Sequence, residues 1–410
     1  MKVIVPVDLS IMPWNVNSAV NERAKFVVAA GEPEANISEL CRQYGISRET
    51  GYKWLKRFEV EGPAGLANGS HTPKRRPHAM SDGMREAILK MRRTRPSWGP
   101  KKIKACLERE EKAREEDKRR TVPAISSIGE LLKKEGLIHR RRKPRARVGA
   151  SQQPLSRAEA PNDVWSIDYK GWFQTGDGKR CDPLTITDNA SRYLIRLTAM
   201  PEINQERVKG VMEAAFRENG LPVAIRSDNG APFVTAAPAG LSQLSIWWTK
   251  LGIRHERIEP GKPTQNGRHE RFHLSLIKDR LEWEVAWDWK LQQGLFVAYR
   301  KEFNEQRPHE ALGMKTPGEV YEPSVRIYSG RAPEMEYEQR YQVRRVNEGG
   351  TFLWEGERIG ISKVLKGERI GLLESEDDLY EVYFGPVLLG WFDAASGIFV
   401  RVEEMENESS

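Results

Sequence analysis

The strongest constraint on the fold is a change of pattern at Asn162, after which short β-type runs alternate with amphipathic helices. In segment 204–219, for example, apolar residues recur at the spacing of one helix face. The expected strands are 164–172, 184–187, 193–198, 223–227 and 254–258, and the expected helices are 204–219, 241–251, 263–283 and 287–304. Neighbouring strands followed by alternating helices and strands predict a mixed α/β sheet with helices packed on it.

Helical segments precede this sheet, at 19–30, 48–60, 84–95, 100–117 and 126–135, and six short strands between 351 and 402 follow it. The short strands with glycine-containing turns predict a small barrel or sandwich. We therefore expect a multidomain α+β chain. Its segments are a helix-turn-helix domain at 1–70, a second, winged-helix-like DNA-binding domain at 78–140, a basic linker at 141–160, the α/β core at 161–325, a small all-β barrel at 340–404 and a tail at 405–410.

Positive charge is concentrated in one stretch of the chain. Residues 72–147 hold 25 Lys/Arg and 10 Asp/Glu, a net charge of +15, so the remainder carries −7 against the total of +8. A basic stretch on a mildly acidic body indicates a polyanion partner. Within it, 139–147 is expected to be an extended arm on a phosphate backbone, with a plain flexible linker as the alternative. The arm's candidate DNA contacts are Arg140, Arg141, Arg142, Lys143 and Arg145.

Segment 37–60 carries the signature of a helix-turn-helix, with a glycine at the bend and Ser47 as the N-cap of the second helix. Apolar residues define its inward face, which leaves a polar face that can enter a major groove. The candidate DNA contacts on that face are Arg48, Thr50, Lys53 and Arg57. A helical hairpin with solvated basic residues is the alternative. Gly51 weakens the helix prediction, because glycine costs about 1 kcal/mol relative to alanine in a helix.

Composition excludes several classes of protein. Cys41, Cys106 and Cys181 are odd in number and far apart, so they imply no disulfide framework. No apolar run approaches the roughly 20 residues of a membrane span, and the N-terminus lacks the apolar region of a signal peptide. We therefore expect a cytoplasmic protein with no membrane partner.

Three acidic residues stand out by position. Asp168 lies within a strand-like run, where a carboxylate is disfavoured by propensity. Asp228 ends another strand, a place where ligand sites gather in α/β sheets, although a simple turn is the alternative. Glu270 lies on the helix after a Gly/Pro-containing segment. Together they predict a divalent metal site, because hard ions such as Mg²⁺ prefer oxygen ligands. Two ions about 3.5–4 Å apart can activate a nucleophile and stabilise the leaving oxygen of a phosphodiester.

Five motifs in order carry a family resemblance: NDVWSID (162–168), TDNASRY (187–193), RSDNGAP (226–232), GKPTQNGRHERF (261–272) and NEQRPHEALGMKTPGEVY (304–321). They resemble the catalytic core of bacterial insertion-sequence DDE transposases, which have the ribonuclease-H-like fold of retroviral integrases. The resemblance implies cleavage of DNA at element ends and joining of the 3′-hydroxyl to target DNA, with Mg²⁺ or Mn²⁺. It also implies a homodimer or higher oligomer on DNA and a nucleoid-associated protein.

Matched to the family motif, Asp168 is the first acid, Asp228 the second and Glu270 the third, and these are the predicted catalytic and metal-binding residues. The sequence departs from the family in spacing, since 41 residues separate Asp228 from Glu270. We expect the additional residues, relative to the family, to lie in the loop at 235–242. Glu256 and Glu259 are the alternative third acids.

The resemblance also implies DNA contacts from the helix that carries Glu270. Integrase relatives often carry lysines one and two turns after the third acid, but Leu274 and Ile277 stand there. The candidate substitutes are His269, Arg271 and Lys278, and Asn266 is a further candidate DNA contact.

The C-terminal strands are acidic: residues 351–410 hold 13 Asp/Glu and 5 Lys/Arg. We expect this unit to dock on another subunit's basic region, or to bind DNA through Lys363, Lys366 and Arg369. For the whole chain, the leading hypothesis is an active transposase. A domesticated DNA-binding protein or repressor and a nuclease without strand transfer are the alternatives.

Overall fold

The computed structural model of the chain describes residues 19–68, 80–138, 155–259, 265, 267–281, 285–376 and 378–402. The chain separates into two compact units, Met1–Ala79 and Met80–Ser410. No helix in these described ranges combines the length and apolarity that crossing a bilayer requires. Some predicted DNA contacts lie outside the described residues, namely Arg140, Arg141, Arg142, Lys143, Arg145 and Asn266.

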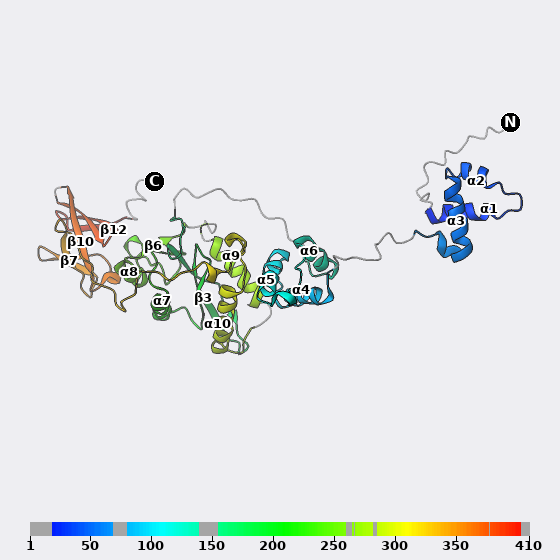
Figure 1. Cartoon of the computed structure of the whole chain (residues 1–410). Helices are drawn as coiled ribbons and strands as arrows, with labels where there is room; N and C mark the ends of the chain where they lie inside the picture. The colour runs from blue at the N-terminus through cyan, green and yellow to red at the C-terminus, as the bar shows by residue number, and fades with distance from the viewer. Residues whose placement is uncertain are drawn as a thin grey trace, which may run out of the picture. The chain divides into compact units, whose positions relative to one another are not determined.

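In its described residues, the first unit has three α-helices, α1 (Ala19–Ala30), α2 (Ile37–Gln43) and α3 (Arg48–Glu61), drawn in blue in Figure 1, and a 3-10 helix at Gly62–Leu66. The predicted turn between α2 and α3 is confirmed. Gly45 has a φ of +63°, which favours glycine. Ser47 caps α3, because its hydroxyl accepts a hydrogen bond from the backbone N–H of Thr50 at 3.1 Å.

Gly51 is buried inside this unit although it weakens helix α3. A Cβ at this position would lie 2.6 Å from the sulfur of Cys41 and 3.0 Å from the ring of Phe26. The glycine therefore permits α3 to approach α1 and α2 closely, and the packing gained offsets its poor helix propensity. Arg48 and Lys53 lie on the exposed face of α3, as the sequence predicted.

The second unit begins with another helical group, α4 (Asp82–Thr94), α5 (Pro100–Lys112) and α6 (Ile125–Lys134). Helix α5 ends earlier than the predicted residue 117. The apolar core of this helical group includes Ile88, Ile103 and Ile128, which are all fully buried. The group contacts the α/β core through ion pairs, with Arg95 2.7 Å from Glu302.

The predicted mixed sheet is confirmed. Its strands are β1 (Val164–Tyr169), β2 (Phe173–Gln174), β3 (Arg180–Asp188), β4 (Leu194–Met200), β5 (Ala224–Ser227) and β6 (Arg254–Arg257). The order is β2-β3-β1-β5-β6, and β4 also pairs with β3. The β1–β3 and β3–β4 pairs are antiparallel, whereas β1–β5 and β5–β6 are parallel. Strand β1 is shorter than predicted and β3 is longer.

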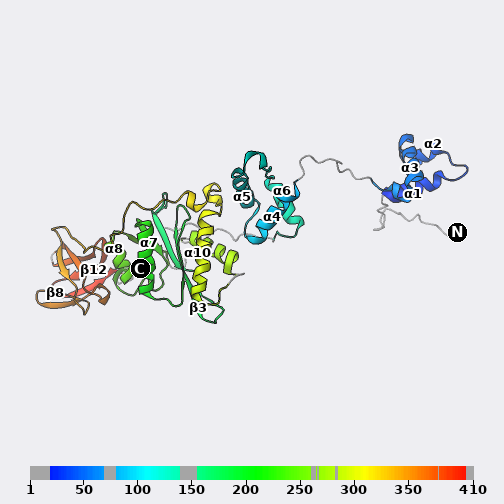
Figure 2. The same ribbon diagram turned by 60° about the horizontal axis from the view of Figure 1, so that its bottom comes forward.

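Helices cover both faces of this sheet, as Figure 2 shows for α7 and α10. On one face lie α7 (Gln205–Asn219) and α8 (Gln243–Lys250), and on the other lie α9 (Gly267–Leu276) and α10 (Trp289–Glu305). Strand β4 contributes to both, because Ile195 packs in the α7–α8 core while Leu194 and Leu197 pack with α10, and the register of its pairing with β3 shifts between Ile186 and Thr187. Both faces are therefore buried, and any functional side chain must find room at an end of the sheet.

The C-terminal strands form a five-stranded antiparallel sheet and a separate hairpin. The sheet has the order β13-β12-β11-β10-β7, and its strands are β7 (Gln342–Arg345), β10 (Arg369–Glu376), β11 (Leu379–Phe384), β12 (Val387–Asp393) and β13 (Ile398–Arg401). The hairpin pairs β8 (Thr351–Trp354) with β9 (Glu357–Gly360). Among the described strands, β7 and β13 do not pair with each other, so the predicted closed barrel is not confirmed.

This C-terminal unit packs on the α/β core of its own chain. Leu241 and Ile246 belong to the same apolar core as Phe352 and Phe392. The ammonium of Lys250 donates to both carboxylate oxygens of Glu368 at 2.9 Å. Loop 235–242, expected to hold surplus residues, therefore forms part of this contact.

Candidate functional site

Strand β1 places Asp168 on the polar face of the sheet, because alternate residues of a strand point to opposite faces. Trp165 and Ile167 are buried in the α7–α8 core. Ser166 and Asp168 point the other way, and the Ser166 hydroxyl exchanges hydrogen bonds with the side chain of Asn189. A polar patch thus interrupts the face that α9 covers.

The parallel pairing of β1 and β5 aligns Asp168 with Asp228. Val164 pairs with Ala224 and Ser166 with Arg226. Extended by two residues, this register sets Asp228, directly after β5, beside Asp168 on the neighbouring strand. Asp228 also accepts a hydrogen bond from the backbone N–H of Gly230 at 3.1 Å. Neighbouring strands lie about 4.8 Å apart, so the two carboxylates share one end of the sheet.

Helix α9 brings the third predicted acid to the same face. His269, Phe272 and Leu276 form its buried stripe, while Glu270 lies in its first turn and is exposed. Two threonines of β3 fix the helix on the sheet. The Thr185 hydroxyl lies 2.6 Å from His269 Nε2 and 2.8 Å from His273 Nε2, and the Thr187 hydroxyl lies 2.8 Å from His269 Nδ1.

Electrostatics connects the three acids. Burial, then the neighbouring carboxylate of Asp228 and, more weakly, that of Glu270 raise the pKa of Asp168 to about 7. Like charges close together oppose ionisation, so this site favours a bound cation over three free carboxylates. We call Asp168, Asp228 and Glu270 the carboxylate cluster.

A second potential metal group overlaps this cluster. Ligand atoms of Asp168, His269 and His273 lie within 4.8 Å of one another. However, both ring nitrogens of His269 contact threonine hydroxyls, and the Nε2 of His273 lies 2.8 Å from the hydroxyl of Thr185. Because a hard ion such as Mg²⁺ prefers oxygen, the donor set fits the carboxylates better than the imidazoles.

The prediction that His269 contacts DNA is wrong. Its side chain is 0% exposed, and it serves to hold α9 on β3. Sequence reasoning failed because a histidine inside a basic motif looks like a surface residue, whereas helix periodicity places it in line with Phe272. Arg271 and Lys278 are exposed, so DNA contact from them remains a prediction.

The alternative third acids are engaged elsewhere. The carboxylate of Glu256 is buried and accepts from the guanidinium of Arg226 at 2.8 Å. Glu259 accepts from the side chain of Gln265 at 2.7 Å.

Two candidate DNA contacts of the first unit form hydrogen bonds within that unit. The hydroxyl of Thr50 bonds the hydroxyl of Ser47, and the guanidinium of Arg57 donates to the carbonyl of Ala67 at 3.3 Å.

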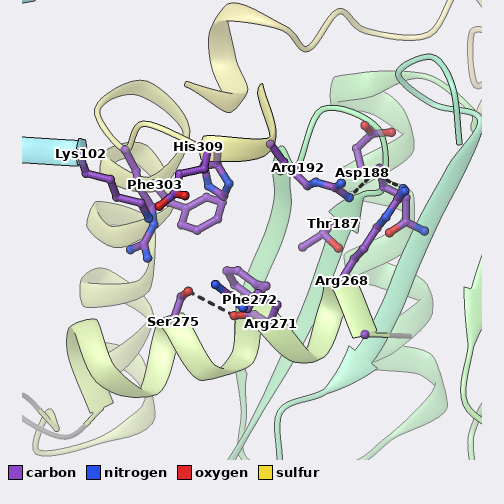
Figure 3. A pocket seen from close by; sticks show the side chains of 15 residues that line it. Lys102, Thr187, Asp188, Arg192, Arg268, Arg271, Phe272, Ser275, Phe303 and His309 are labelled. Atoms are coloured by element: carbon purple, nitrogen blue, oxygen red, sulfur yellow. Dashed lines mark hydrogen bonds between the residues drawn. The ribbon is translucent and has the colours of Figure 1, made fainter. Parts of the chain in front are cut away.

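One feature of the core escaped the sequence analysis. A cavity of about 500 Å³ lies on the side of α9 that carries Arg268 and Arg271 (Figure 3). We call it the cationic pocket, and its basic residues are Lys102, Arg192, Arg268, Arg271, Arg307 and His309. They come from α5, the turn after β3, α9 and the segment after α10. Apart from Lys102, these residues lie in the quoted motifs, but only folding shows that all six converge.

Comparison with known proteins agrees with this architecture. The family model described as an integrase core domain matches residues 158–263, a second of the same description matches 251–317, and homeodomain-like domain models match 19–67 and 50–125. The chain is 28% identical to the uncharacterized 31.7 kDa protein of insertion element IS407 from Burkholderia multivorans over 294 residues, 71% of this chain and 93% of that protein. It is 30% identical to the uncharacterized 39.2 kDa protein of IS476 from Xanthomonas euvesicatoria over 184 residues, 44% of this chain and 50% of that protein.

Among solved structures, the HTLV-2 integrase catalytic core domain in complex with magnesium is similar over 40% of this chain and 100% of its own length, with 16% identity and a TM-score of 0.32. The family models and the insertion-element relatives confirm the resemblance to insertion-sequence transposases. Residues 158–317 are thus similar to integrase core domains, and residues 19–125 ahead of them are similar to homeodomain-like domains.

Proposed function

We propose that this chain, an integrase-core protein similar to those of bacterial insertion sequences, is a DDE transposase that cleaves DNA at element ends and joins the 3′-hydroxyl to target DNA. Asp168, Asp228 and Glu270 would hold Mg²⁺ or Mn²⁺, with two ions per site. When bound, such ions activate the attacking oxygen and stabilise the leaving oxygen of a phosphodiester.

A single observation carries this proposal: the register of β1 and β5 sets Asp228 beside Asp168, whose pKa is raised to about 7 by burial, by Asp228 and, more weakly, by Glu270. The two aspartates come from adjacent strands and the glutamate from a helix fixed on β3 by His269 and His273. Like charges gathered around the half-buried Asp168 are unfavourable alone, and a ligand of opposite charge would compensate them.

The protein's own residues have distinct roles in the proposal. The exposed faces of the helix-turn-helix unit, with Arg48 and Lys53, would recognise element ends in a major groove. Two recombining ends need two active sites, so a dimer or larger assembly on DNA is expected. The acidic C-terminal unit would take part in that assembly, although it also packs on its own core.

The test combines the purified full chain with Mg²⁺, supercoiled plasmid and duplexes taken from the DNA that flanks its coding sequence. Joined products support the proposal. Nicks alone would identify a nuclease without strand transfer, and binding without cleavage would identify a repressor-like binder; either outcome overturns it.

Asp228→Asn isolates the metal assignment, because it removes one charge and keeps the shape of the side chain. We expect joining to fall by roughly 10³-fold or more while end binding stays unchanged. Asp117→Asn is the matched control, since Asp117 is an exposed aspartate between α5 and α6. Wild-type joining by Asp228→Asn would refute the assignment.

A further inference from the structure

We infer that the cationic pocket binds a backbone phosphate of a DNA strand, on the side of α9 opposite the carboxylate cluster. The inference rests on the proposed function for the identity of the nucleic acid. The pocket itself stands on its own geometry, in which five cationic side chains and one histidine line a single cavity.

Charge in this pocket is not balanced by the protein. Among its lining residues, only Asp188 and Glu310 are acidic. Asp188 is buried, and one of its carboxylate oxygens accepts from the hydroxyl and backbone N–H of Ser191. Lys102 and Arg271 form no ion pair with any residue that the structure describes. An anion entering this cavity would therefore meet an excess of positive charge.

The cations also repel one another. Burial, then the charge of Arg307, lowers the pKa of Lys102 to about 8. Burial, followed by Arg307, Lys102 and Arg192, lowers the pKa of His309 to about 3, so its imidazole is neutral. Two arginines are fixed on one acceptor, because Arg192 and Arg268 both donate to the carbonyl of Asn189, at 2.5 and 2.9 Å. Such preorganised repulsion is relieved by an anion.

Unmet hydrogen-bonding capacity points the same way. Arg307 is 5% exposed and ion-paired with Asp279, yet its Nε has no partner among the described residues. The Nε2 of His309 is likewise buried without a partner in that part of the chain. Buried polar atoms are rarely left unsatisfied. A phosphate offers acceptor oxygens to the Nε–H of Arg307, and to His309 in the tautomer that carries its proton on Nε2.

Helix α9 relates this pocket to the carboxylate cluster. Its buried stripe faces the sheet, with Glu270 on one flank and Arg268, Arg271 and Ser275 on the other. Figure 3 shows Arg268 and Arg271 on α9, with Lys102 and His309 across the cavity. A strand whose scissile phosphate lies at the carboxylates can thus place another phosphate in the pocket. Lys102 comes from α5, so the second helical group completes the site.

The experiment maps single phosphates with neutral methylphosphonates. Binding of the full chain to a flanking-DNA duplex is measured in EDTA, where no chemistry occurs, with one phosphate neutralised at a time. At one or two positions, we expect neutralisation to weaken wild-type binding roughly three- to tenfold. At those positions, neutralising the phosphate should not weaken DNA binding by Lys102→Gln or Arg271→Gln any further. Each variant has already lost the contact with that phosphate.

Controls keep this test decisive. Arg207→Gln alters a basic residue on α7, far from the pocket lining, and should keep the full wild-type sensitivity at every position. Melting temperatures of all variants verify folding. If Lys102→Gln and Arg271→Gln show the wild-type pattern, the DNA assignment is overturned.

Inorganic phosphate distinguishes the two possible ligands of the pocket, a phosphate of the DNA backbone and a free phosphate ion. Stabilisation of the wild type but not of Arg271→Gln by phosphate, with unchanged methylphosphonate patterns, would identify a small-anion site and overturn the inference. Because binding is measured without metal, loss of the pocket effect is distinguishable from absence of joining, which concerns the proposed function alone.

Discussion

The two flanks of α9 collect charge of opposite sign. On one, burial and two neighbouring carboxylates raise the pKa of Asp168 to about 7; on the other, burial and Arg307 lower the pKa of Lys102 to about 8. Each group is driven toward its neutral form first by burial and then by like charges around it. The comparison teaches that this helix separates two sites with an excess of opposite charge, acidic on one flank and basic on the other, the first suited to cations and the second to phosphate.

Removal of the Glu270 carboxylate has the largest expected effect, because it changes the acidic flank of α9 and leaves the basic flank intact. Glu270→Gln should reduce strand joining by roughly 10³-fold or more, because it removes a proposed metal ligand. Binding of DNA should not weaken. Joined product on end-containing duplexes with Mg²⁺ provides the measurement. Glu259→Gln is the control, since Glu259 was the competing candidate; equal loss in both variants, or loss only in Glu259→Gln, would break the assignment.

Arg307→Met should produce the next largest effect, on stability. Arg307 is the buried cation of the pocket, and its guanidinium pairs with Asp279. Removing it leaves a buried carboxylate unpaired, which costs about 3–5 kcal/mol. Denaturant unfolding of the full chain measures this. Arg307→Met with Asp279→Asn should recover part of the loss; an unaltered midpoint in Arg307→Met would show that the cations are not built into the core.

Asp168→Asn should change how stability depends on pH. Since the pKa of Asp168 rises from 3.8 to about 7 on folding, the folded protein binds more protons between these values. The stability of the metal-free wild type therefore falls as pH rises through this window and levels off above it. At pH 8 the variant should be more stable by on the order of 1–3 kcal/mol, and at pH 4 the difference should vanish.

Urea unfolding in EDTA at both pH values measures this difference, with Asp117→Asn as the control that should show none. A stability difference that is the same at pH 4 and pH 8 would contradict the close approach of the three carboxylates.

The sequence predicted the carboxylate cluster better than the cationic pocket, for a physical reason. Asp168 breaks the propensity of a strand, and Asp228 ends the neighbouring one, so each acid leaves a local sign. Arg192, Arg307 and His309 lie in turns and segments where polar residues are ordinary. Their convergence depends on how α5 and α10 pack, which no local pattern contains.

The fold itself was largely predictable because periodicity determines it. Six strands, β8 to β13, lie among the described residues between 351 and 402, where six short strands were expected. Strand β7 was missed, because Gln342–Arg345 carries exposed polar side chains at the sheet edge. The burial of His269 was missed because its partners, Thr185 and Thr187, lie on β3, more than 80 residues earlier in the chain.

Thr187→Val has the smallest expected effect and tests the helix that both flanks share. The Thr187 hydroxyl is buried 2.8 Å from Nδ1 of His269, and valine would leave that nitrogen without its partner. We expect a loss of about 1 kcal/mol in unfolding free energy. Because α9 carries Glu270 and Arg271, both joining rate and methylphosphonate sensitivity should decline together. Thr187→Ser keeps the hydroxyl and should preserve both; if serine and valine behave alike, the hydrogen bond does not position the helix.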